Sequence, residues 1–258
     1  MKPGRNWRIV RYSALVGLVS VIIATGVRAT GDWRTASREP VGLAPNPATT
    51  PEAIVQVYAA RTVGMRGAFG VHSWIAVKPA NADAYIVYEV TRWKLRWSDT
   101  SVSIHRRAPD ARWFGAEPEL LAEKRGAAAE ALIGRIDYAA RAYPHAGEYS
   151  AWPGPNSNTF VAWITRAVPE LEVDLPPTAI GKDFLGGRML SSAPSGSGFQ
   201  FSLGGVFALT ASGVEGLEVN VLGLTFGVNP FDPALKLPMI GRIGPTRVHS
   251  GPAPDALR

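Results

Sequence analysis

Residues 67–78 read GAFGVHSWIAVK, and their side chains alternate between two faces, as they do along a β-strand. A turn, PANAD (79–83), separates this stretch from a second β-branched and aromatic run, AYIVYEVTRW (84–93). The two runs predict an antiparallel hairpin, to which TSVSIHRR (100–107) adds a third strand. One face of the first strand carries Val71, Ser73, Ile75 and Val77, and the other carries His72, Trp74, Ala76 and Lys78.

Helical patterns follow further along the chain. Residues 125–143 are rich in alanine and place Leu132, Ile136 and Ala139 or Ala140 on one face, which predicts a helix. A second helix is expected to end at Pro169 and to bury a face spaced at i, i+3, i+4 and i+7, formed by Phe160, Trp163, Ile164 and Ala167.

Two regions flank these elements. PEAIVQVYAARTV (51–63) has Ile54, Val57 and Tyr58 at helical spacing, so we expect a short helix there. Residues 170–198 are rich in loops. Two strands are expected after them, over 199–213 and 215–229, followed by an irregular tail.

The fold class expected from these patterns is α+β, an antiparallel sheet with packed helices, C-terminal β-strands and one N-terminal membrane helix. The expected division is a membrane anchor or signal segment at 1–29, a linker or strap at 30–50 and an α+β domain at 51–185. A glycine-rich β region at 186–245 and a tail at 246–258 complete it.

The N-terminus indicates a compartment. Residues 12–27, YSALVGLVSVIIATGV, are uncharged, and four basic residues with no acidic residue precede them. This pattern predicts a single-pass anchor in the cytoplasmic membrane with the following domain periplasmic or otherwise extracytoplasmic. The alternative is a signal peptide cut near Ala29, which would make the protein secreted.

The charge and composition exclude several classes of function. Residues 1–28 carry five of the 27 basic residues and no acid, so the remaining chain is nearly neutral and lacks the basic stripe of a nucleic-acid binder. The chain has no cysteine, and its four histidines are too far apart in sequence for a zinc motif. We therefore expect no nucleic-acid partner, no metal and no cofactor.

The stretch PGPNSNTF (153–160) delivers Ser157 to the start of the second predicted helix. Ser157 can serve there as a helix cap, a role that Asn156 or Asn158 could share. It can also serve as a nucleophile, because a helix N-terminus stabilises developing negative charge and His72 could accept the hydroxyl proton.

Four segments carry a resemblance to a known family: GVHSWIAVKP, YEVTRWKL, YPHAGEYSAWPGPNSNTFVAWI and LPPTAIGKDF. Over about residues 50–185 they resemble a bacterial family described as domain of unknown function 3750. More distantly, the strand histidine and the Asn-x-Asn-x-Phe string look like the circularly permuted papain-like hydrolases and acyltransferases, the NlpC-type and lecithin-retinol acyltransferase group. That resemblance implies a permuted papain-like core.

The papain-like resemblance implies roles for individual residues. His72 matches the base, Ser157 stands where that group has its catalytic cysteine, and Glu89 or Thr91 would orient the imidazole. Since a hydroxyl is a much weaker nucleophile than a thiol, two functions follow. The first is a non-catalytic envelope binding or scaffold module, with a groove formed by Trp74, Trp152, Asn156 and Asn158. The second is a serine-dependent hydrolase or acyltransferase on an amide or ester. A cell-wall peptide or a lipid would be the ligand in either case.

Overall fold

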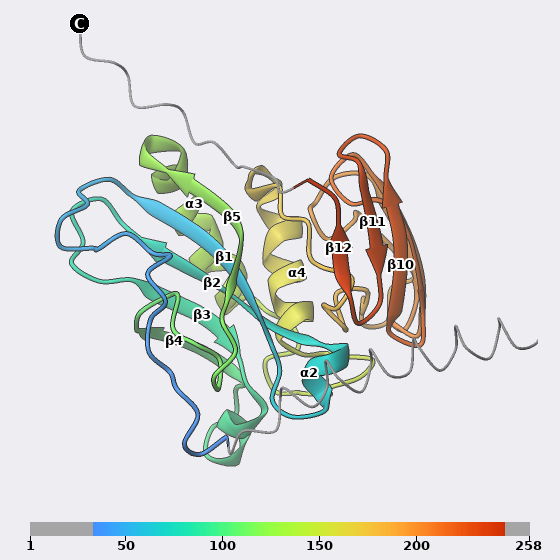
Figure 1. Ribbon diagram of the computed structural model, residues 1–258, viewed down its shortest axis with the longest axis horizontal. Helices are drawn as coiled ribbons and strands as arrows, with labels where there is room; N and C mark the ends of the chain where they lie inside the picture. The colour runs from blue at the N-terminus through green and yellow to red at the C-terminus, as the bar shows by residue number, and fades with distance from the viewer. Residues whose placement is uncertain (1–32, 246–258) are drawn as a thin grey trace, which may run out of the picture.

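The computed structural model describes residues 33–245. Two antiparallel sheets face each other across a pair of helices, and α4 (Ser157–Ala167) lies between the sheets (Figure 1). The mixed α and β architecture with antiparallel sheets is therefore confirmed. The predicted anchor at 12–27 lies outside the described residues, and no helix within 33–245 has the length and apolar character needed to cross a membrane.

The first sheet has five strands in the order β4-β3-β2-β1-β5. The predicted hairpin is confirmed, because β2 and β3 pair antiparallel, and β4 joins β3 as the expected third strand. The strands are β1 (Ile54–Arg61), β2 (Val71–Lys78), β3 (Ile86–Val90), β4 (Val102–Arg106) and β5 (Glu119–Arg125). Residues 67–69, expected to open the first strand of the hairpin, belong to the short helix α2 (Arg66–Phe69) instead.

The helix predicted over 51–63 was wrong, because this stretch forms β1 between β2 and β5. Both faces of β1 are buried: Val55 and Val57 pack on the helix side, while Ile54 and Tyr58 pack on the opposite side. A strand buried on both faces has apolar residues at almost every position. Some of them then fall at helical spacing, so periodicity alone cannot separate the two structures.

The two faces of this sheet are covered differently. Helices α3 (Gly126–Arg141) and α4 pack on one face and close the main hydrophobic core. The strap at 33–50 crosses the other face, where Pro40 bridges Ala111 and the Tyr85 hydroxyl donates to the Pro45 carbonyl at 3.0 Å. The described part of the predicted linker is thus packed along the domain.

Both predicted helices form, but the buried face of α4 is wider than expected. Phe160 and Ile164 are fully buried as predicted, whereas Trp163 is half-buried and Ala167 is exposed. Val161 and Thr165 are buried in their place. The reason is that α4 has the first sheet on one side and loops leading to the second sheet on the other, so most of its circumference is covered.

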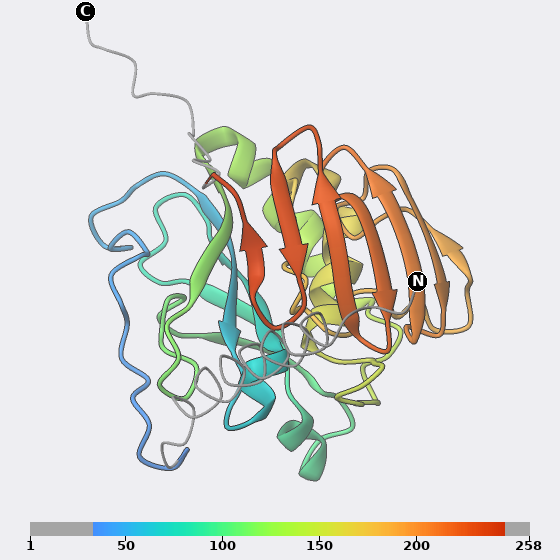
Figure 2. The same cartoon turned by 45° about the vertical axis from the view of Figure 1, so that its right-hand side comes forward.

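The second sheet has seven strands in the order β12-β11-β10-β9-β8-β7-β6 (Figure 2). The two strands predicted over 199–229 are in fact four, because Gly204, Gly205 and Gly223 adopt positive φ angles and make hairpin turns. The tail expected to be irregular contributes two more strands. The strands are β6 (Leu190–Ser191), β7 (Phe199–Leu203), β8 (Phe207–Ser212), β9 (Gly216–Val221), β10 (Leu224–Asn229), β11 (Ala234–Leu237) and β12 (Gly241–Ile243).

Candidate functional site

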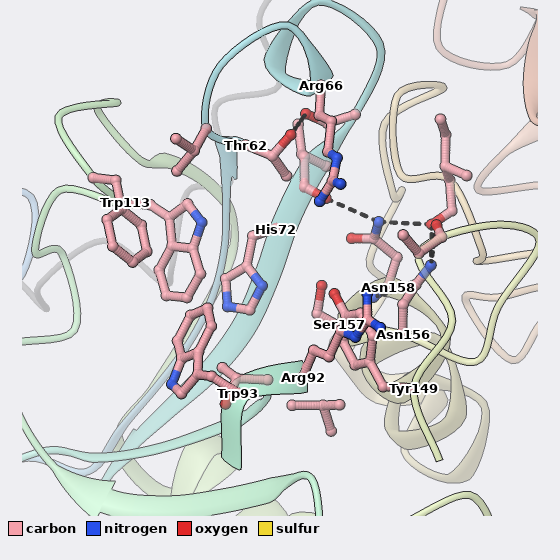
Figure 3. A pocket seen from close by; sticks show the side chains of 18 of the residues that line it. Thr62, Arg66, His72, Arg92, Trp93, Trp113, Tyr149, Asn156, Ser157 and Asn158 are labelled. Atoms are coloured by element: carbon pink, nitrogen blue, oxygen red, sulfur yellow. Dashed lines mark hydrogen bonds between the residues drawn. The ribbon is translucent and has the colours of Figure 1, made fainter. Parts of the chain in front are cut away.

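A pocket of about 1230 Å³ opens at the start of α4. His72 lines it from the β2 side and Ser157 from the α4 side (Figure 3). Eight aromatic side chains surround it: Trp33, Phe69, Trp93, Trp97, Trp113, Phe114, Tyr149 and Trp152. The pocket thus brings together the predicted base and nucleophile within a largely aromatic wall.

Ser157 is the first residue of α4, and the helix is capped by Asn156. The Asn156 side-chain oxygen accepts the amides of Asn158 at 2.9 Å and Thr159 at 3.2 Å, while the Thr159 hydroxyl accepts the Asn156 amide at 3.1 Å. Ser157 is therefore not the cap. Because Asn156 occupies the next two amides, the backbone N–H of Ser157 is the first-turn donor that has no acceptor within the described residues.

Asn156 and Asn158 also fix the position of this helix start. The Asn156 side-chain nitrogen donates to the Ile180 carbonyl at 3.0 Å, and that of Asn158 donates to Ile180 at 2.8 Å and to Val71 at 3.0 Å. A side chain at Gly181 would lie 2.3 Å from Asn156, and Gly181 has φ +97°. The two asparagines, predicted to bind a ligand, line the pocket but use their amides to pin α4 to β2 and to the 176–184 loop.

His72 is held by Glu89 on the neighbouring strand. Its Nε2 lies 3.0 Å from the Glu89 carboxylate, and its ring stacks on Trp113 at 3.6 Å between ring centres. The alternative orienting residue, Thr91, instead donates its backbone amide to the Ser101 carbonyl. The structure therefore places Glu89, and not Thr91, in contact with the imidazole.

The electrostatics of this pair fix the proton on the imidazole. Burial tends to raise the pKa of Glu89, but the hydrogen bond from His72 and the charge of Arg107 lower that pKa to about 2. Burial lowers the pKa of His72. An ionised Glu89 beside a neutral imidazole requires the hydrogen on Nε2, which leaves the Nδ1 lone pair as the group that can accept a proton.

His72 and Ser157 line the same pocket, but their side chains are not hydrogen-bonded to each other. Within residues 33–245 no hydrogen bond of 3.5 Å or less joins the imidazole to the Ser157 hydroxyl. The hydrogen bond that joins β2 to Ser157 runs from the Ser73 hydroxyl to the Ser157 carbonyl at 3.4 Å. A proton transfer between the predicted pair would need a side-chain rotation or an intervening water.

Of the two tryptophans predicted to form the groove, one lines the pocket and the other does not. Trp152 is partly exposed and lines the pocket. Trp74, expected in the groove, is fully buried outside the pocket lining, where it stacks on Tyr58 and donates its indole N–H to the Pro109 carbonyl at 2.8 Å. Trp74 lies two residues after His72 on β2 and so on the same face of the sheet, but there it is enclosed in the core cluster that includes Tyr58 and Tyr85.

The positive charge of this pocket was not predicted from the sequence. Its lining contains four arginines, Arg38, Arg66, Arg92 and Arg96, and no aspartate or glutamate. Burial raises the pKa of Tyr149, and the charges of Arg66 and Arg92, which line the same pocket, oppose that rise. Neither forms an ion pair with another described residue. The alternating run RWKLRW (92–97) was the available signal.

The fold and the pocket define a class of protein: two antiparallel sheets around α4, with a cationic and aromatic cavity at its first turn. The chain belongs to the family described as protein of unknown function (DUF3750), whose model matches residues 52–184. The match runs from β1 through α4 to the loop that bonds Asn156 and stops before the second sheet. No curated protein and no solved structure matches the chain.

Membership of the family of unknown function is confirmed, whereas the papain-like resemblance finds no support in these comparisons. Within the described residues, no group of three or more histidines and carboxylates could hold a metal ion.

Proposed function

We propose that the pocket at the start of α4 binds an anionic amphipathic molecule of the cell envelope, and that the protein acts there as a membrane-anchored, non-catalytic binding module. The observation that carries this proposal is the lining itself, which combines eight aromatic side chains and four arginines with no carboxylate. A cavity of this size suits a ligand with an apolar part and a few charged groups.

The arginines favour a phosphate or carboxylate headgroup. A guanidinium donates two parallel hydrogen bonds to either group, and charge-assisted bonds of this kind are among the strongest in proteins. Arg66 and Arg92 have no carboxylate partner in the described chain, so an anion would not have to displace one. The rings of Trp93 and Trp113 offer the flat apolar wall for a lipid or peptide portion.

The proposal is tested by affinity for three amphiphiles that share an octyl chain: octyl phosphate, octyl trimethylammonium and octyl glucoside. Isothermal titration calorimetry on the full chain in lipid nanodiscs, corrected with empty nanodiscs, should rank the phosphate first by at least about tenfold, or about 1.4 kcal/mol. Replacing both Arg66 and Arg92 with glutamine should remove this preference.

A matched control replaces Arg135 with glutamine, because this arginine lies on α3 and pairs with Glu170 outside the pocket. The preference should persist in that variant. Equal affinity for the three headgroups in the wild-type chain, or a preference that survives loss of both Arg66 and Arg92, would contradict the proposal.

A second candidate function is favoured by the Glu89–His72 hydrogen bond beside Ser157. In a serine-dependent hydrolase or acyltransferase, the Ser157 oxygen would attack the carbonyl carbon of an ester or amide while His72 Nδ1 takes its proton. The Ser157 N–H would stabilise the oxyanion, and His72 would return the proton to the leaving oxygen or nitrogen. Water or an acceptor alcohol would then release the acyl group.

This second candidate predicts covalent labelling by a serine-directed fluorophosphonate. Label should be found on Ser157 by peptide mass spectrometry and should be lost in both Ser157→Ala and His72→Gln, while Ser73→Ala keeps it. Absence of label on the wild-type chain, under conditions that label a serine hydrolase added to the same sample, would contradict the hydrolase candidate and leave binding as the remaining proposal.

A further inference from the structure

The seven-stranded sheet has one face built entirely of apolar side chains. Cross-strand pairs put these residues on the same side: Leu209 lies opposite Val219, and Val219 lies opposite Phe226. In the four longest strands the apolar outer positions are Phe199, Phe201, Leu203, Phe207, Leu209, Ala211, Leu217, Val219, Val221, Leu224, Phe226 and Val228. These twelve residues are all of the outward positions in the four strands, so no outward position there is polar or charged. Most of the large side chains among them are exposed.

The inner face of the same sheet is polar. Glu218 accepts hydrogen bonds from the buried amino groups of Lys182 and Lys236, and Asp183 accepts from Gln200 and Asn220. Neither hydrophobic core cluster of the described chain includes a residue of this sheet. The polarity is thus reversed relative to an ordinary sheet on a soluble domain, since apolar burial normally lies on the inner face.

A sheet with this polarity gains its hydrophobic stabilisation only when something covers the outer face. A monomeric soluble protein rarely leaves a contiguous apolar patch of more than a few hundred Å² exposed. About thirty strand residues, each spanning about 3.4 Å along a strand and about 4.8 Å across the sheet, give a footprint of roughly 500 Å². Two such faces together bury about 1,000 Å² or more, which reaches the size of a specific interface.

We propose that the outer face of the seven-stranded sheet is covered by the same face of a second copy of this chain. Two sheets packed face to face form a sandwich about 10 Å thick whose inward side chains interdigitate, as apolar sheet faces do within single domains. The contact is isologous, so one self-complementary surface suffices and the assembly closes as a two-fold dimer.

The composition of the face favours a protein partner over a bilayer surface. Surfaces that lie in the membrane interface use tryptophan and tyrosine at the headgroup level and lysine or arginine around them. The outer face has none of these four residue types, although the chain contains 8 Trp and 7 Tyr. Uninterrupted aliphatic and phenylalanine side chains resemble a domain core cut in half, which is typical of obligate homodimers.

The test uses the absence of cysteine from the chain. Val219 stands at the centre of the middle strand, so full-length Val219→Cys in native membranes should be joined to a dimer by a short bis-maleimide crosslinker. Tyr138→Cys, on the exposed side of α3, serves as the control and should stay monomeric. We expect at least about half of Val219→Cys in the crosslinked band.

Three results would overturn the proposal. An uncrosslinked Val219→Cys whose thiol reacts freely means that the face is open. An uncrosslinked thiol that is protected in membranes and released by mild detergent means that the face lies on lipid. Equal crosslinking of Val219→Cys and Tyr138→Cys means that random collision, not a specific interface, joins the chains.

Discussion

Replacing Glu218 with glutamine is expected to lower the free energy of unfolding by about 3–5 kcal/mol, the range for removing one partner of a buried ion pair. Glu218 is fully buried and pairs with Lys182 and with Lys236, the latter at 2.7 Å. Burial alone would lower the pKa of Lys182, but the Glu218 carboxylate raises it. Glutamine keeps the shape of the side chain and removes the charge that both ammonium groups require.

The measurement is urea unfolding followed by tryptophan fluorescence. Its matched control is Glu170→Gln, which breaks the exposed pair with Arg135 at 2.6 Å and should cost less than about 1 kcal/mol. Similar small losses in both variants would show that the inner face of the second sheet does not depend on its buried charges.

Replacing Phe160 with alanine is expected to cost about 3–5 kcal/mol, the range for removing a buried aromatic ring. Phe160 is fully buried on α4 and packs edge-to-face on Tyr143, with 5.1 Å between ring centres. Because α4 presents Ser157 to the pocket, the cavity left by the ring should also loosen the helix start and weaken octyl phosphate binding.

The control for Phe160→Ala is Tyr138→Ala on the exposed side of α3, where loss of the ring should change the unfolding free energy by less than about 0.5 kcal/mol. Urea unfolding and calorimetry on the same preparations separate stability from binding. A Phe160→Ala variant as stable as Tyr138→Ala would contradict the assignment of α4 to the core.

Local periodicity explains which elements were predictable. The β2–β3 hairpin is marked by the PANAD turn between two β-branched runs, and α3 keeps one apolar stripe, so each follows from its own residues. Strand β1 does not, since its burial on both faces depends on β5 and on the strap at 33–50. The second sheet was divided wrongly because Gly204 and Gly223 lie inside the two runs that were each expected to form one strand, whereas their positive φ angles make turns.

The residues of the candidate site were likewise predictable only in part. His72, Glu89 and Ser157 could be proposed from a strand pattern, a hairpin and a helix start, and the structure brings them to one pocket or, for Glu89, into contact with His72. Arg66 and Arg92 could not be placed there from the sequence. They come from short turns outside the main elements, α2 and η1 (Arg92–Arg96), whose direction depends on tertiary packing.

The most direct test of the binding account places a single thiol in the pocket. In the full-length Ser157→Cys variant, the rate of alkylation by iodoacetamide reports whether the first turn of α4 is covered. Saturating octyl phosphate should slow this rate at least about tenfold and leave the rate of Tyr138→Cys unchanged. An alkylation rate at Ser157→Cys that octyl phosphate does not alter, measured where calorimetry shows the ligand bound, would contradict binding in this pocket.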